Sequence, residues 1–172
     1  MSGYLNDAIL LYVNDLIDWD SYFYPLDALI DWNRIYGRRG FAEYQCALPL
    51  ATSRDGLAEM LNVIADSGLS PFLAVTKRLG PGAADRPLSF PIEGYTLALD
   101  FPLSSGALKL MDRLDEILLA AGGRLYLAKD SRMTRETFEE SYGTGRTAFA
   151  ELIAREAGSL TFASLQSRRL GL

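Results

Sequence analysis

The stretch FAEYQCALPLATSRDGLAEMLNVIADSG, residues 41–68, contains a predicted strand followed closely by a predicted helix. Residues 41–48 are mostly apolar or aromatic and end at a proline, a pattern typical of a strand. Thr52 or Ser53, with Asp55 just beyond, provides the N-cap of a helix over about residues 54–66 that stops at Gly68. This β-α unit is the starting point for the rest of the fold.

The next hundred residues continue the pattern. Residues 72–77 are predicted to form a second strand, and the turn-rich segment 80–87 separates it from a third strand at about 95–101. Ser104 or Ser105 caps a helix that runs to the glycine pair 122–123, and residues 124–128 supply a fourth strand. The order is β-α-β-β-α-β, so we predict an α+β fold with a ferredoxin-like antiparallel sheet.

Helices are expected to flank this core on both sides. Apolar residues at helical spacing predict an N-terminal helix over about residues 4–17. After the core, Thr134 with Glu136 just inside predicts a helix to about Tyr142, and residues 146–156 form a further helix. The basic pair Arg168 and Arg169 is expected to belong to a solvated tail. All 172 residues suit a single domain.

Composition excludes several classes of function. The net charge of -5 argues against nonspecific nucleic-acid binding, which needs an excess of Lys and Arg. Because the chain has no histidine, Ser-His-Asp and Cys-His catalysis and the usual His-containing zinc sites are excluded, and no metal site is predicted. The apolar stretches fall short of the roughly 20 residues that span a bilayer. With no basic N-terminal region, a signal peptide is not expected, and the predicted location is cytoplasmic or peripherally membrane-associated.

Two residues near the fourth predicted strand are candidates for chemistry. Lys129 lies at the end of that strand, where a rigid sheet can hold a side chain toward a ligand, and Tyr126 lies three residues earlier on the same edge. The simpler interpretation is a solvated lysine that is ion-paired with Asp130. Spacing alone leaves both interpretations open.

Lys77 and Gln45 form a second candidate pair. Lys77 ends the second predicted strand, and a ferredoxin-like sheet would bring it near Gln45 on the first. On one face, the two could bind the phosphate and hydroxyls of a sugar phosphate, although Lys77 could equally be solvated. If Gln45 is buried, its amide needs partners. Its neighbour Cys46 has no basic residue nearby and is predicted to be a small buried hydrophobe.

An aromatic segment near the N-terminus allows two interpretations. Aromatic faces stack on sugar rings and prenyl chains, but they also form cores and domain interfaces. The residues concerned are Trp19, Tyr22, Phe23, Tyr24 and Trp32.

Three stretches resemble a known family. They are YPLDALIDWNRIYGRRGFAEYQ at 24–45, KRLGP at 77–81 leading to LSFPIEG at 88–94 and LDFP at 99–102, and GRLYLAKDSR at 123–132. In this order they look like the C-terminal substrate domain of decaprenylphosphoryl-β-D-ribose 2-oxidase-like FAD-linked oxidases, which have the vanillyl-alcohol oxidase fold. The likeness spans about residues 20–172.

The resemblance implies an FAD-dependent oxidoreductase that transfers a hydride from a sugar hydroxyl carbon to flavin, within the synthesis of cell-wall arabinan precursors. In that family a separate N-terminal domain binds FAD, and the domain seen here covers the flavin ring and forms the substrate pocket. A short-chain dehydrogenase partner then reduces the keto product. We therefore expect residues 1–172 to be the substrate-binding domain, with the FAD-binding domain absent from this chain and required as a partner domain or subunit.

The same resemblance implies roles for individual residues. Lys129 and Tyr126 would be the catalytic and cofactor-binding residues beside flavin and substrate, and Gln45 and Lys77 would contact the polar head of the substrate. A lysine beside the flavin makes physical sense, because its charge would stabilise the negative charge that develops as hydride arrives.

The chain also departs from the family pattern. The resemblance places Thr96 and Ala98 in the same pocket, but the lipid-ribose oxidases carry Asn and Cys at these positions. The identity of the substrate therefore stays open between a lipid-linked ribose, a different sugar or carrier, an aldonolactone and a sugar alcohol. Leu165 stands where the relatives have Asp. The alternative from another class is a non-catalytic ferredoxin-like binding or assembly module. Exposed apolar surface at the docking face would favour the oxidase domain, and a polar surface would favour the module.

Overall fold

The computed structural model describes residues 18–24, 28, 30–82, 86–157 and 163–172. The chain divides into two units, residues 1–35 and 36–172. The smaller unit contains the short helix α1 (Trp19–Phe23), whose N-cap Asp18 accepts a hydrogen bond from the Ser21 amide. A 3-10 turn, η1 (Trp32–Tyr36), spans the division. The helix predicted over residues 4–17 lies outside the described residues.

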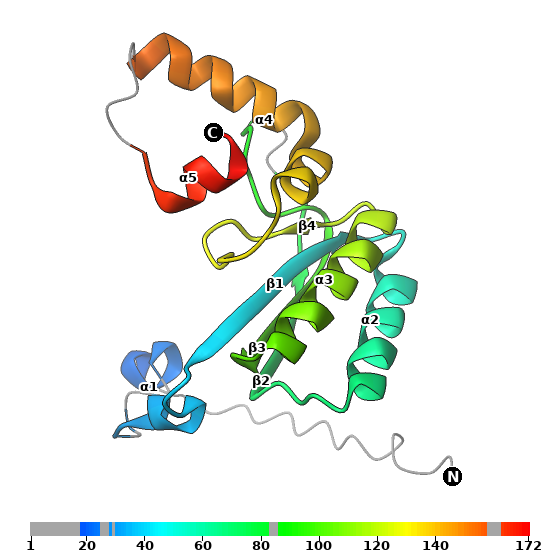
Figure 1. Ribbon diagram of the computed structural model, residues 1–172, viewed down its shortest axis with the longest axis vertical. Coiled ribbons are helices and arrows are strands. Elements are labelled where there is room, and N and C mark those ends of the chain that lie inside the picture. The colour runs from blue at the N-terminus through cyan, green and yellow to red at the C-terminus, as the bar shows by residue number, and fades with distance from the viewer. Residues whose placement is uncertain (1–17, 25–27, 29, 83–85, 158–162) are drawn as a thin grey trace. The chain divides into compact units, whose positions relative to one another are not determined.

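The larger unit is built on a four-stranded antiparallel sheet in the order β2-β3-β1-β4 (Figure 1). Its strands are β1 (Phe41–Pro49), β2 (Leu73–Leu79), β3 (Gly94–Pro102) and β4 (Arg124–Leu125). Helix α2 (Ser53–Ser67) follows β1, and helix α3 (Ser105–Ala120) follows β3. The predicted β-α-β-β-α-β order and the ferredoxin-like α+β class are therefore confirmed.

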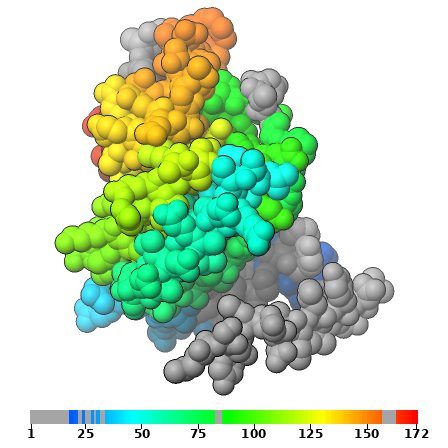
Figure 2. Space-filling view, turned by 90° about the vertical axis from the view of Figure 1, so that its right-hand side faces the viewer, coloured from blue at the N-terminus to red at the C-terminus, as the bar shows by residue number. Residues whose placement is uncertain are grey.

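Helices α2 and α3 pack together against one face of the sheet, and the space-filling view shows them as neighbouring bands (Figure 2). As predicted, Ser104 caps α3 by accepting a hydrogen bond from the Ala107 amide, and α2 ends at Gly68 with a left-handed φ of 68°. Alternate strand residues point to opposite faces, so one face can be buried while the other stays open. The core on the helix side includes Tyr44, Cys46, Leu48, Met60, Leu97, Leu99, Phe101, Met111, Leu114 and Leu118.

The fourth strand is shorter than predicted. Only Arg124 and Leu125 pair with β1, although the Tyr126 amide still donates to the Gln45 carbonyl at 2.8 Å. The Lys129 amide then donates to the Tyr126 carbonyl at 3.0 Å, which closes a turn. The prediction that the strand continues to residue 128 is wrong, because this turn takes the backbone out of the sheet. Lys129 therefore lies on a turn after the strand.

Two helices complete the larger unit: α4 (Arg135–Ala157) and α5 (Leu165–Leu170). Gly143 has φ 43° and ψ -120°, so it breaks the helical path of α4 into two segments that match the two predicted helices.

Two predictions about single residues need correction. Arg169 on α5 binds Asp130 at 2.8 Å. The prediction of a solvated basic tail is wrong for this residue, because a buried carboxylate holds it. Lys77 is also not the last residue of its strand, since β2 continues to Leu79.

Candidate functional site

The sheet face that turns away from α2 and α3 carries the four predicted substrate-binding residues. Residues that are paired in an antiparallel register point to the same side, so strand pairing decides which side chains share this face. We call it the open face, although Ala47, Thr96 and Asp100 within it are themselves buried. It is formed by Phe41, Glu43, Gln45 and Ala47 of β1, Thr96, Ala98 and Asp100 of β3, and Leu73, Val75 and Lys77 of β2.

Two rows of the open face contain the predicted substrate contacts. In one row Lys77 pairs with Thr96, which pairs with Ala47. In the next row Ala98 pairs with Gln45, and the Gln45 amide donates to the Thr96 hydroxyl at 3.3 Å. The partner that this amide was predicted to need is therefore on the neighbouring strand. Lys77 and Gln45 lie on one face, as predicted, in adjacent rows of the sheet.

A third row of the open face is acidic and forms an ion pair with Lys129. Glu43 pairs with Asp100 across β1 and β3, and the ammonium nitrogen of Lys129 lies 3.1 Å from Glu43 Oε2. The simpler interpretation, in which Lys129 pairs with Asp130, is wrong about the partner, since Asp130 binds Arg169. The analysis of the sequence missed Glu43. The signal that could have found it is the two-residue period of a strand, which puts Glu43 on the same side as Gln45.

Asp100 is the second carboxylate of this row, and Tyr36 covers it. The Tyr36 hydroxyl donates to Asp100 Oδ2 at 2.7 Å, and the Tyr36 ring stacks on Phe41 with ring centroids 4.0 Å apart. Burial, and then the hydrogen bond to Asp100, raise the pKa of Tyr36 to about 12. Tyr36 therefore stays protonated at neutral pH and acts as a donor to the acidic row.

The turn that carries Lys129 is held by Asp130. Its Oδ1 accepts the amides of Arg132 and Met133 at 2.9 and 2.7 Å, and its Oδ2 accepts from Arg169 at 2.8 Å. Burial alone would raise the pKa of this carboxyl, but the bonds from Met133, Arg169 and Arg132 outweigh it and lower the pKa. The backbone beside Lys129 is therefore fixed, while the Lys129 side chain remains 47% exposed.

Tyr126 lies next to the open face at the point where β4 ends. Its ring stacks on Phe90, with centroids 4.4 Å apart, and it lines a small crevice together with Glu43 and Gln45. The structure thus brings Tyr126 together with Gln45, and Lys129 joins them through Glu43.

The end of the open face beside Tyr36 is apolar. Phe41 is 43% exposed and Leu73 is 48% exposed, and the neighbouring Phe72 packs edge-on against Tyr36. Phe41 and Leu73 therefore form an exposed apolar margin of the open face.

The aromatic segment of the smaller unit is described only in part. Trp19 and Tyr24 are exposed, and their rings meet edge to face with centroids 6.4 Å apart. The side chains of Tyr22, Phe23 and Trp32 lie outside the description. Both interpretations of this segment stay predictions. None of the helices in the described part of the chain is long and apolar enough to cross a bilayer.

No family model matches the sequence. The chain is 42% identical over 134 residues to decaprenylphosphoryl-beta-D-ribose oxidase of Mycolicibacterium smegmatis (strain ATCC 700084 / mc(2)155), which covers 76% of this chain and 28% of that protein. It is 37% identical over 146 residues to an uncharacterized protein in the mprA 5' region of Streptomyces coelicolor, which covers 84% of this chain and 39% of that protein. The matches thus span less than half the length of either relative. The chain is therefore a relative of decaprenylphosphoryl-beta-D-ribose oxidase and matches a domain-length part of it, consistent with the C-terminal domain.

Proposed function

We propose that this chain is the substrate-binding domain of an FAD-dependent oxidoreductase that oxidises a hydroxyl of a sugar, either a lipid-phosphate-linked ribose or a related sugar. One observation carries the proposal: the predicted substrate-binding residues share the open face, and Lys129 reaches that face through Glu43. A domain that closes over a reaction centre needs polar contacts on an uncovered surface with an apolar margin. Phe41 and Leu73 supply that margin.

The rows of the open face suit a sugar phosphate. Lys77 offers a point charge for a phosphate, and the Gln45 amide offers both a donor and an acceptor for hydroxyls. Rows on one face repeat every two residues, which is about 7 Å along a strand. A phosphate at the Lys77 row and a sugar ring at the Gln45 row would therefore contact neighbouring rows of one sheet.

Lys129 is the described residue best suited to meet a flavin. It is cationic and half exposed, and Asp130 fixes its backbone at the edge of the open face. FAD, held mainly by a separate domain or subunit, would supply the hydride acceptor. The Lys129 charge would stabilise the negative charge that develops nearby, and Tyr126 would line the same pocket.

The wider setting of the reaction is also part of this proposal. The M. smegmatis relative is named as an oxidase of a decaprenylphosphoryl ribose. By that likeness the chain would act in the synthesis of arabinan precursors for the cell wall, with a short-chain dehydrogenase reducing its keto product. Thr96 and Ala98 are the residues whose departure from the family pattern bears on the choice of sugar.

The test is complementation with flavin. The purified chain is mixed with an FAD-binding domain encoded next to its gene, and FAD absorbance is followed on anaerobic addition of candidate sugars. Bleaching that requires both proteins supports the proposal. The absence of both a complex and bleaching, or a bleaching rate that does not depend on this chain, contradicts it.

A further inference from the structure

Helix α5 lies against the turn that carries Lys129, residues 126–133, and bonds to it directly. The helix is itself held at both ends. Ser164 and Ser167 exchange two hydrogen bonds of 2.9 Å at its start, and Leu170 is fully buried at its end. Because both ends are fixed, the side chains that α5 directs at the turn act as a rigid support.

Gln166 of α5 contacts the backbone on both sides of Lys129. Its side-chain amide donates to the Leu127 carbonyl at 2.7 Å, and the same nitrogen lies 3.3 Å from the Asp130 carbonyl. Leu127 precedes Lys129 by two residues, and Asp130 follows it directly. One side chain therefore fixes the backbone before and after the lysine.

Arg169 supports the same turn three residues further along α5. Side chains at this spacing share one face of a helix, so Arg169 and Gln166 approach the turn together. Arg169 donates to Asp130 Oδ2 at 2.8 Å and also to the Met133 carbonyl. The Asp130 side chain is only 4% exposed, so loss of Arg169 would leave a buried carboxylate without its cation.

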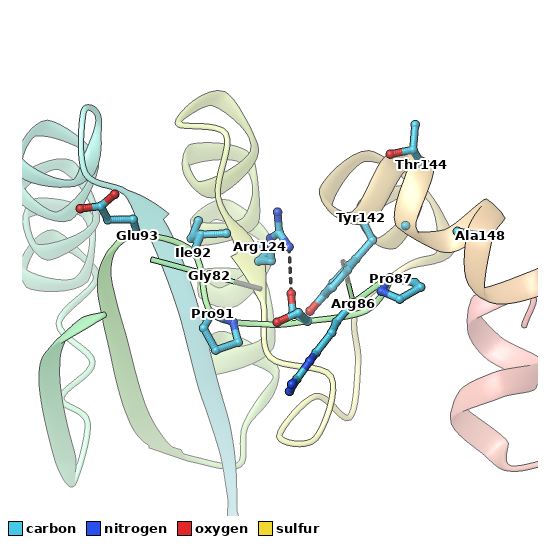
Figure 3. A pocket seen from close by; sticks show the side chains of 12 residues that line it. Gly82, Arg86, Pro87, Pro91, Ile92, Glu93, Arg124, Tyr142, Thr144 and Ala148 are labelled. Atoms are coloured by element: carbon cyan, nitrogen blue, oxygen red, sulfur yellow. Dashed lines mark hydrogen bonds between the residues drawn. The ribbon is translucent and has the colours of Figure 1, made fainter. Parts of the chain in front are cut away.

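The two ends of the 126–133 turn are anchored to other helices. Just before it, the Arg124 guanidinium lies 5.3 Å from the ring centroid of Tyr142 on α4 (Figure 3). Near its end, Arg132 binds Asp115 of α3 at 2.7 Å. The ends of the turn are thus held by α4 and α3, and α5 holds its middle.

The support ends at the backbone of Lys129. Its amide donates to the Tyr126 carbonyl at 3.0 Å, whereas its ammonium group extends to Glu43 at 3.1 Å and its side chain is 47% exposed. A lysine side chain is long and flexible, so it reaches a defined place only when its backbone is fixed. The place of this ammonium therefore depends on α5.

We propose that Gln166 and Arg169 are positioning residues for Lys129, which set through the 126–133 turn where its ammonium group meets the open face. The inference rests on the proposed function for what Lys129 does there. It adds the last helix of the chain, which lies outside the sheet, to the elements on which the oxidation depends. A displacement of about 1 Å in a catalytic group can cost about 100-fold in rate, so loosening either contact is expected to slow the reaction.

Acetylation of lysine side chains tests the position without flavin. The lysines of the sequence are Lys77, Lys109 and Lys129, and the exposed Lys109 on α3 is an internal reference. An ammonium group held by a carboxylate reacts slowly, because the ion pair must separate first. Gln166→Leu and Arg169→Met are expected to raise the acetylation rate of Lys129 relative to Lys109 by up to about fivefold, which is the full contribution of an exposed ion pair. Mass spectrometry of peptides measures both rates.

Two further variants serve as controls for the acetylation. Arg168→Met, on the exposed side of α5, should leave the ratio of rates unchanged. Arg169→Lys keeps a charged donor for Asp130, so it should restore most of the wild-type ratio. Circular dichroism checks that each variant is folded at the labelling temperature, so that lower stability alone does not alter the ratio. An unchanged ratio in folded Gln166→Leu and in folded Arg169→Met would overturn the proposal, and in one of them would remove that residue from the role.

A double-mutant cycle with flavin separates positioning from a general structural role. In the complemented protein, Gln166→Leu is expected to lower the rate of flavin reduction about tenfold. It should have no further effect when Lys129 is already alanine, because the group that it positions is gone. Equal losses in the two backgrounds would mean that Gln166 does not act through Lys129, and would overturn its positioning role.

The two experiments distinguish failure of this inference from failure of the proposed function. If the wild-type chain never supports flavin reduction, the oxidase role is lost, whereas a raised acetylation ratio would still support α5 as the element that places Lys129. If flavin reduction occurs but neither the ratio nor the cycle links α5 to Lys129, only this inference is lost.

Discussion

The ammonium nitrogen of Lys129 lies 3.1 Å from Oε2 of Glu43, which joins the turn after β4 to the middle of the open face. Water screens this ion pair because Lys129 is about half exposed, so its contribution to stability is small, at most about 1 kcal/mol. A second domain that docked here would exclude that water and strengthen the field of both charges. The pair therefore contributes little to folding, and under the proposed function its larger effect would be on chemistry at the open face.

Replacement of Lys129 tests that chemistry. Lys129→Ala is expected to lower the rate of flavin reduction by about 100-fold in the complemented protein, because a charge aimed at the reacting centre is lost. The unfolding temperature should barely change. Anaerobic stopped-flow absorbance measures the rate, and Lys109→Ala on the exposed side of α3 is the control. An unchanged rate of reduction would remove Lys129 from the mechanism.

Substrate choice is expected to depend on Thr96 and Ala98. Installing the side chains of the lipid-ribose oxidases, as Thr96→Asn with Ala98→Cys, should raise the preference for a lipid-linked ribose over a free aldonolactone or sugar alcohol. One added hydrogen bond corresponds to about a tenfold change. The measurement is the ratio of kcat/KM for the two substrates. A ratio that stays the same would mean that these positions do not select the sugar.

Stability at acidic pH should depend on Asp130. Its pKa is lowered in the folded chain, so the stabilisation is complete above the unfolded pKa of about 3.9 and is lost as pH falls through the lower folded value. Asp130→Asn is expected to cost about 2 kcal/mol at pH 7, since charge-assisted bonds to Arg169 and to two amides are weakened.

Urea unfolding of both proteins between pH 7 and pH 2 measures this effect. The difference in the free energy of unfolding between wild type and Asp130→Asn should shrink below about pH 4, where the unfolded chain binds a proton at this carboxyl before the folded chain does. Asp112→Asn, at an exposed carboxylate of α3, serves as the comparison. A difference that does not vary with pH would contradict the assignment.

Cys46 should be unreactive in the folded chain. It is fully buried, and burial raises the pKa of its thiol to about 12. Because the thiolate is the reactive form, a thiol reagent such as dithionitrobenzoate is expected to label native protein very slowly and one thiol per chain after unfolding. An Ala98→Cys variant, with a new thiol on the open face, should react much faster than wild type. Rapid labelling of native wild type would indicate local opening of the sheet.

The core of the fold was predictable because its signals are local. Proline and glycine end β1 and α2, Ser104 caps α3, and strand and helix periods alternate in the order that the sheet needs. The length of β4 was not predictable in this way. Residues 124–128 have the composition of a strand, but the bond between the Lys129 amide and the Tyr126 carbonyl, together with the anchoring of Asp130 by distant Arg169, turns the chain early.

The candidate site was predictable residue by residue but not as a set of contacts. Strand positions indicated Gln45, Lys77 and Lys129 as candidates, and the family resemblance supplied their expected roles. The two-residue period of a strand explains why Gln45 and Lys77 share a face. Glu43 could be identified as the partner of Lys129 only from the spatial arrangement of elements that lie more than eighty residues apart in sequence. The adjacent Asp130 was therefore the nearer but incorrect candidate for this ion pair. Tyr36 was missed for the same reason, because its carboxylate partner lies on β3.

The position of β2 at the margin of the sheet has a consequence for solubility. In the described part of the chain β2 pairs with β3 alone, so its outer backbone groups could template the addition of a strand from another molecule. Lys77 and the adjacent Arg78 point to opposite sides of this strand, and such charges discourage intermolecular pairing. A neutral replacement of Lys77 would therefore expose the protein to self-association as well as altering ligand contacts.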